Sequence, residues 1–137
     1  MKLTENEVIE ILCHYLEKEG WSIENKAINH DRGEDIVAKK DNKLLIVEAK
    51  GAKGNPKSSV TKKVKFDSGQ IKTHFGKAIV KILDEKLKPK YKNSTFAIAH
   101  PDDADIRKTI GKITPFLKQL DIIHFWVSAD GQVIEEN

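Results

Sequence analysis

Apolar residues recur at helical spacing near the start of the chain. Between Val8 and Leu16 they stand three or four positions apart, which places them on one face of a helix. Thr4, with Glu7 three residues later, has the signature of a capping box, and a glycine follows the last apolar position. The pattern predicts a helix over about residues 5–19.

Short apolar runs bounded by polar residues predict strands in the rest of the chain. The stretch 51–68 has no periodicity and contains five lysines, which predicts a long loop. A third helix opens after residues 101–103, and Pro115 must kink or restart it. The expected strands cover 21–27, 35–39, 44–50, 94–99 and 121–127, with a turn into a last short run at 132–134, and the second helix covers 70–87.

The order of these elements is α-β-β-β-α-β-α-β, which predicts an α/β fold with a mixed central sheet flanked by helices. The chain has 137 residues, the length of one domain. It contains no internal repeat, low-complexity segment or linker. We therefore expect one domain over residues 1–137.

Composition excludes several classes of protein. No apolar run approaches the roughly 18 residues of a membrane helix, and the first residues lack the apolar stretch of a signal peptide. The one cysteine, Cys13, excludes an internal disulfide and a cysteine-based zinc site. These features predict a cytoplasmic protein without a membrane partner.

Charge is distributed unevenly along the chain. Residues 1–49 carry 7 basic and 11 acidic side chains, residues 50–92 carry 13 and 3, and residues 93–137 carry 4 and 7. A basic middle third suits a surface that faces a polyanion. A lysine-rich solvated surface explains the same numbers, since 22 of the 24 basic residues are lysine.

Two carboxylates face each other in the predicted hairpin. If Asp41-Asn42 is a two-residue turn, counting back along both strands pairs Asp35 with Glu48, with Cβ atoms roughly 5 Å apart. A three-residue turn would shift this pairing by one position. Like charges so placed repel each other, and a divalent cation removes the repulsion.

The residues around this pair suit a hard cation. Two carboxylates, the carbonyl of Ala49 and water are oxygen ligands that Mg²⁺ or Mn²⁺ prefers. Lys50 projects from the same face as Glu48 and can position a water or neutralise charge that develops on a phosphate. The alternative to a metal site is a surface hairpin whose end is charged because it is exposed to solvent. The uniformly apolar run just before Glu48 argues against it.

The sequence Gly33-Glu34-Asp35, twelve further residues and then Glu48-Ala49-Lys50 resembles the PD-(D/E)XK nuclease superfamily, and its Mrr-like and Holliday-junction-resolvase-like branches in particular. The resemblance covers roughly residues 5–100. It implies the restriction-endonuclease-like fold and metal-dependent nuclease activity. The chain departs from the family pattern at Glu34, where a proline precedes the aspartate in many members.

The resemblance also implies a role for each position. Asp35 and Glu48 resemble the metal-binding carboxylates and Lys50 the catalytic lysine. An acidic residue of the first helix completes such sites in the family, and Glu10 stands where it is expected. A solvated helix residue explains Glu10 equally well. Gln70 of the second helix resembles a glutamine that orients water or the metal ligands.

Basic residues near the hairpin are candidates for contacts with nucleic acid. His74 lies on the polar face of the second helix, where a packing or phosphate-contact role competes with that of a general base. Arg32 lies near the expected cleft, and a loop salt bridge explains it as well. The predicted contacts are Arg32, Lys53, Lys57, Lys62, Lys63, Lys65, His74, Lys77 and Lys81.

These observations together predict a Mg²⁺- or Mn²⁺-dependent nuclease that hydrolyses phosphodiester bonds in DNA. The alternative is an inert nucleic-acid-binding or accessory domain of the same fold that acts within a larger complex. A homodimer or a partner subunit is compatible with either function, since cutting both strands needs two sites.

Overall fold

The computed structural model describes residues 2–28, 33–55 and 65–136. The described strands are β1 (Ser22–Lys26), β2 (Ile36–Lys40), β3 (Lys43–Ala49), β4 (Thr95–Pro101), β5 (Ile122–Val127) and β6 (Val133–Glu136). The α-helices are α1 (Glu5–Lys18), α2 (Ser68–Leu87) and α3 (Ala104–Ile110), and the short 3-10 helices are η2 (Pro89–Tyr91) and η3 (Thr114–Leu120).

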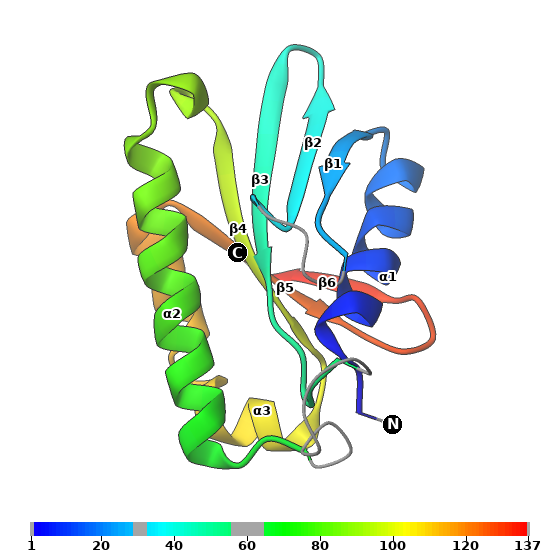
Figure 1. Cartoon of the computed structure of the whole chain (residues 1–137), viewed down its shortest axis with the longest axis vertical. Helices are drawn as coiled ribbons and strands as arrows, with labels where there is room; N and C mark the ends of the chain where they lie inside the picture. The colour runs from blue at the N-terminus through cyan, green and yellow to red at the C-terminus, as the bar shows by residue number, and fades with distance from the viewer. Residues whose placement is uncertain (1, 29–32, 56–64, 137) are drawn as a thin grey trace.

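The six strands form one mixed sheet in which spatial order follows sequence order from β1 to β6 (Figure 1). The pairs β1–β2, β2–β3 and β5–β6 are antiparallel, whereas β3–β4 and β4–β5 are parallel. Parallel neighbours need a crossover connection. The long helix α2 makes the first crossover and α3 with η3 makes the second, so the expected α/β architecture is confirmed.

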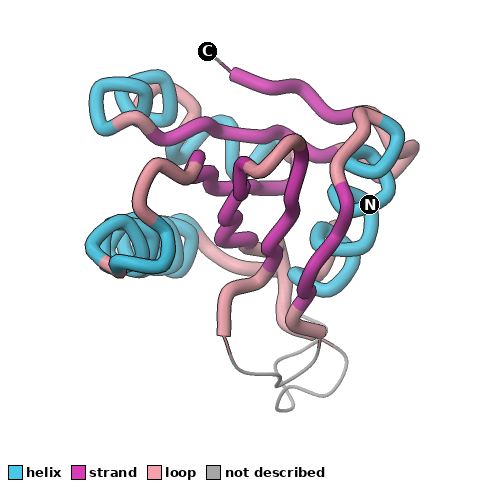
Figure 2. Tube along the Cα trace, turned by 90° about the horizontal axis from the view of Figure 1, so that it is seen from above, coloured by secondary structure: helices cyan, strands magenta, loops and turns pink. Residues whose placement is uncertain are grey.

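Helices cover both faces of the sheet (Figure 2). One buried apolar cluster joins α1 to the sheet, and the other joins α2, α3 and η3 to the opposite face. Alternation along β3 divides its side chains between these clusters. Leu45 and Val47 belong to the α1 side, while Ile46 belongs to the α2 side. Glu48, two residues after Ile46, therefore also faces α2.

The hairpin of β2 and β3 has the predicted register. Asp41 and Asn42 form its turn with φ angles of 50° and 67°, as a type I′ turn requires. Lys40 then pairs with Lys43, and Ile36 pairs with Val47. The predicted helix after residue 103 ends at Ile110, and η3 starts anew around Pro115.

Within the described part of the chain, none of the helices combines the length and the apolar character needed to cross a membrane.

Candidate functional site

The hairpin brings Asp35 and Glu48 together at the edge of the buried core. Asp35 directly precedes β2 and Glu48 lies near the end of β3, so the pair continues the register of Ile36 and Val47. The side chain of Asp35 accepts a hydrogen bond of 2.8 Å from the backbone N–H of Ala49. Asp35 is 7% exposed and Glu48 5%. Two carboxyl groups are thus held side by side away from water.

Burial makes ionisation of this pair costly. The pKa of Glu48 is raised to about 8, first by burial and then by the neighbouring charge of Asp35, although the charges of Lys81 and Lys50 act in the opposite direction. Burial also raises the pKa of Asp35, against the hydrogen bond from Ala49 and the charge of Lys81. A carboxyl pair of this kind retains a proton near neutral pH unless a cation compensates its charge.

Two lysines approach the pair from different elements. Lys50, which follows β3, places its Nζ 3.8 Å from Oε2 of Glu48. Lys81 of α2 places its Nζ 3.3 Å from Oε1 of Glu48 and donates a hydrogen bond of 3.2 Å to the carbonyl of Gly33. Lys81, predicted as a nucleic-acid contact, thus lies beside the carboxylates.

Glu5 belongs to the same electrostatic group, although sequence reasoning missed it. Burial raises its pKa to about 7, and the charge of Asp35 contributes. Glu5 lines a hollow of about 200 Å³ together with Lys50, Lys53 and His74. Glu5 therefore lies beside Lys50 and close enough to Asp35 to feel its charge.

A glycine allows the helix start and the strand end to meet there. A Cβ at Gly51 would lie 2.4 Å from the backbone nitrogen of Glu5, far closer than packed atoms approach each other. Next to it, the N–H of Ala52 donates to the carbonyl of Leu3 at 2.7 Å. Gly51, directly after Lys50, was the signal in the sequence that another backbone passes close by.

Glu10 is not brought to the carboxylate pair. It forms an ion pair with Lys26 of β1 and is more than half exposed. It lines a separate hollow on the other side of α1, next to Ile11 and Ile28. Of the acidic residues in the first helix, it is Glu5 that lies near Asp35.

The polar residues of α2 divide between the helix start and the site. Gln70 is exposed and completes a capping box, since its side-chain oxygen accepts from the N–H of Asp67 at 2.9 Å. His74 is half-buried, with its ring 4.5 Å from that of Phe66. Burial lowers the pKa of His74, and the charges of Lys50 and Lys77 lower it further. His74 thus borders the hollow, whereas Gln70 supports the helix start.

The predicted loop contacts are only partly described. Arg32, Lys57, Lys62 and Lys63 lie outside the described residues. Lys53 pairs through its backbone with Thr4 and with Lys65, which joins the loop to the start of the chain. The Nζ of Lys65 lies 3.2 Å from Asp105.

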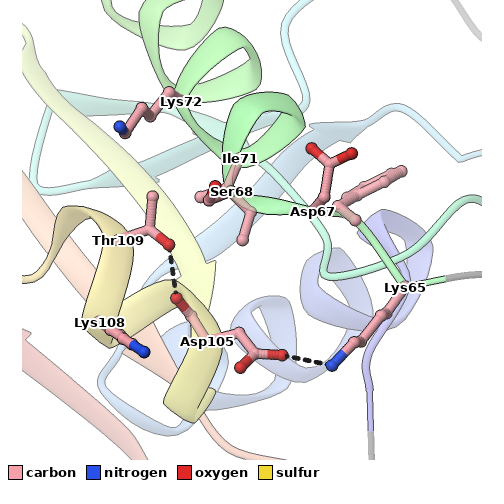
Figure 3. Close-up of a pocket in the computed structure, with 9 residues that line it drawn as sticks. Lys65, Asp67, Ser68, Ile71, Lys72, Asp105, Lys108 and Thr109 are labelled. Carbon is pink, nitrogen blue, oxygen red and sulfur yellow. Dashed lines mark hydrogen bonds and ion pairs between the residues drawn. The ribbon is translucent and has the colours of Figure 1, made fainter.

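A second, larger hollow of about 460 Å³ lies at the start of α2 and α3 (Figure 3). Lys65, Lys72 and Lys108 line it, and Phe66 borders both this hollow and the smaller one. Lys72 and Lys108 form no ion pair with another residue in the described ranges. Asp67 and Asp105 line the same hollow, so its lining carries three lysines against two aspartates. Sequence reasoning did not select Lys72 and Lys108.

Glu34 secures the segment that precedes Asp35. It accepts a hydrogen bond from the hydroxyl of Tyr91, and the Nζ of Lys88 lies 3.7 Å from its other oxygen. Both partners follow the end of α2. Glu34 therefore anchors the segment before β2 to the residues that follow α2.

The donor set suits a hard divalent cation, because the two buried carboxylates repel each other and are stabilised by positive charge. Within the described ranges no three His, Cys, Asp or Glu side chains are grouped to hold a metal. No protein-family model, curated protein or solved structure matches this chain. The function proposed below therefore rests on the geometry of the site.

Proposed function

We propose that the protein is a metal-dependent nuclease that hydrolyses phosphodiester bonds in DNA. The observation that carries the proposal is the buried pair of Asp35 and Glu48 with Lys50 two residues further on. Such a pair is expensive to maintain, since it destabilises the folded chain whenever both groups are ionised. Binding of a cation between the two carboxylates would compensate their charge and remove this destabilisation.

The arrangement of the elements supports a restriction-endonuclease-like fold as part of this proposal. The motif of the PD-(D/E)XK superfamily would lie at the start of β2 and the end of β3, and α2 would then cross to the parallel strand β4. Lys50 would be the lysine of the motif, on the same face as Glu48.

Asp35 and Glu48 would hold Mg²⁺ or Mn²⁺, together with the carbonyl of Ala49 as predicted. The bound metal would lower the pKa of a water and polarise the phosphate. The ammonium of Lys50 neutralises negative charge on the phosphate as it develops. Glu5 borders the same hollow, where a carboxyl group with a pKa of about 7 can hold or release a proton near neutral pH.

The larger hollow would bind the phosphate backbone of the substrate. Lysine side chains attract phosphates without reading base sequence, and Lys65, Lys72 and Lys108 come from three segments around one concave surface. Because Phe66 borders both hollows, a strand bound beside Lys50 would continue toward these lysines.

The test is cleavage of plasmid, linear, single-stranded and branched DNA, and of RNA, with Mg²⁺, Mn²⁺ or EDTA. We expect metal-dependent cleavage that Asp35→Asn and Lys50→Met each reduce by about 100-fold or more. The matched controls are Asp41→Asn and Lys43→Met, which change the same residue types at the exposed far end of the same hairpin. Cleavage by the Asp35→Asn and Lys50→Met variants at the rate of the controls would refute the proposal.

One observation favours a second function, a nucleic-acid-binding domain without turnover. Lys81 and Lys50 already compensate Glu48, so the pair can be stabilised without a metal. Salt-sensitive binding of DNA without cleavage of any substrate, alone or with a partner subunit, would support this function.

A further inference from the structure

A row of polar side chains crosses the sheet from the candidate site to its edge. Lys50 donates its backbone N–H to the carbonyl of Ala99, so it stands beside His100 of β4. His124 of β5 follows, and it pairs with Glu136 of β6. Alternation along the strands places all four side chains on the face that α2 covers. Sequence reasoning assigned no chemistry to either histidine, because they are 24 residues apart.

The two histidines are buried and hydrogen-bonded to each other. Each is 1% exposed, and Nδ1 of His100 lies 2.9 Å from Nε2 of His124. The other nitrogen of His124, Nδ1, lies 3.7 Å from Oε1 of Glu136. Burial keeps both rings neutral, since it lowers the pKa of His124 to about 3 and that of His100 well below its usual value.

The carboxylate at the edge determines where the protons of this row lie. A neutral imidazole has one N–H and one lone pair. At 3.7 Å, His124 and Glu136 are not hydrogen-bonded, and neither Nδ1 of His124 nor Oε1 of Glu136 has a hydrogen-bond partner among the described residues. Because a carboxylate only accepts, its negative charge favours the N–H of His124 on Nδ1. Nε2 of His124 then carries the lone pair and accepts a hydrogen bond from Nδ1–H of His100. Because the proton of the His100 ring is on Nδ1, Nε2 of His100 is also unprotonated and can only accept.

The lone pair on Nε2 of His100 lies near the candidate site. The two nitrogens of an imidazole point in nearly opposite directions, and Nδ1 of His100 points to β5. Nε2 therefore lies on the side of the ring away from β5, and Lys50 and His74 are the titratable groups near His100 besides His124. Nε2 is buried, and it has no hydrogen-bond partner among the described residues. A buried acceptor in this state requires a donor.

We propose that Glu136 and His124 are positioning residues that fix His100 as a hydrogen-bond acceptor for the ammonium of Lys50. In the structure that ammonium lies 3.8 Å from Glu48. When a cation occupies Glu48, as in the proposed function, Lys50 loses this partner and Nε2 of His100 replaces it. The row then holds Lys50 beside the reacting phosphate. This catalytic part rests on the proposed function, whereas the proton positions do not.

The proton positions are measured by long-range ¹H–¹⁵N NMR of the histidine rings in the ¹⁵N-labelled full-length chain. We expect the rings of His100 and His124 both to be protonated at Nδ1 and unprotonated at Nε2. In EDTA, where the Lys50 ammonium keeps Glu48 as its partner, Glu136→Ala removes the negative charge next to Nδ1 of His124, so the proton of the His100 ring is expected to move from Nδ1 to Nε2. Glu135→Ala is the matched control, since Glu135 is exposed and faces the other side of β6. A wild-type His100 protonated at Nε2, or unchanged tautomers in Glu136→Ala, would overturn the proposal.

The contact with Lys50 has its own test. With Mg²⁺ present, Lys50→Met should shift the Nε2 signal of His100, whereas Lys53→Met, which removes a lysine from the same hollow, should leave it in place. An unmoved signal in Lys50→Met would overturn the contact. If DNA is cleaved, Glu136→Ala should lower kcat about tenfold with KM unchanged, and Glu135→Ala should change neither. A switched tautomer with unchanged kcat would refute the catalytic role, and absence of cleavage by the wild type would count against the proposed function alone.

Discussion

Replacing Glu48 by Gln removes an ionisable group that the fold holds away from water, and its effect on stability depends on pH. Below pH 4.5, its ordinary pKa, Glu48 is protonated in both the folded and the unfolded chain. Between pH 4.5 and about 8 the folded chain keeps this proton and the unfolded chain releases it. The free energy of unfolding therefore falls as the pH rises.

The size of this effect follows from the width of the window. Each pH unit between 4.5 and about 8 lowers the free energy of unfolding by about 1.4 kcal/mol. The full loss is at most about 5 kcal/mol, a large fraction of the stability of a domain of this size. Glutamine has nearly the same shape and cannot ionise, so Glu48→Gln should lack this loss.

The assay is urea denaturation across this pH window in EDTA, with wild type, Glu48→Gln and, as an exposed control, Glu10→Gln. Wild type and the control should lose stability toward the upper end of the window, while Glu48→Gln should become the most stable of the three. Adding Mg²⁺ at the upper end should stabilise the wild type and leave Glu48→Gln unchanged. Parallel pH profiles for wild type and Glu48→Gln would refute the inferred burial of charge.

Further predictions concern the lysines and the anchor of the hairpin. Lys81→Met removes an ammonium that competes with the metal for Glu48, so calorimetry should detect tighter Mn²⁺ binding. The gain should be at most about fivefold, because a partly exposed ion pair contributes about 1 kcal/mol or less. Weaker binding of Mn²⁺ by Lys81→Met would contradict this. Replacing Lys72 and Lys108 by Glu should weaken DNA binding and lower the salt dependence by about one unit per lost phosphate contact, whereas Lys92→Glu, beyond the far end of α2, should do neither. Tyr91→Phe should lower the urea-derived free energy of unfolding by about 1–3 kcal/mol, because a hydrogen bond to a carboxylate is lost; an unchanged midpoint would exclude that contribution.

The hairpin could be predicted in detail because all its determinants are local. The turn residues Asp41 and Asn42 tolerate the positive φ angles of a tight turn, and alternation then fixes which residues oppose each other. The register that places Asp35 opposite Glu48 follows from counting alone. The new helical start around Pro115 was predictable for the same reason, since the restriction lies within the proline itself.

The partners of this pair depend on contacts between distant segments. Both Glu5 and Glu10 are acidic residues of one helix, and only the approach of Gly51 to the start of α1 selects Glu5. Lys81 and Gln70 both belong to the polar residues of α2. The packing of the helix on the sheet brings Lys81 to Glu48, whereas Gln70 stays at the helix cap.

The elements, their order and the opposition of two carboxylates can be read from the amino-acid pattern, because hydrophobic period, turn residues and strand alternation act over a few neighbouring positions. The charge balance around the carboxylates and the burial of His100 beside His124 emerge from the folded arrangement of distant segments. These properties depend on which strands become neighbours and on how far each side chain is removed from water. Electrostatic energies depend strongly on that removal, so they are fixed only once the layers have packed.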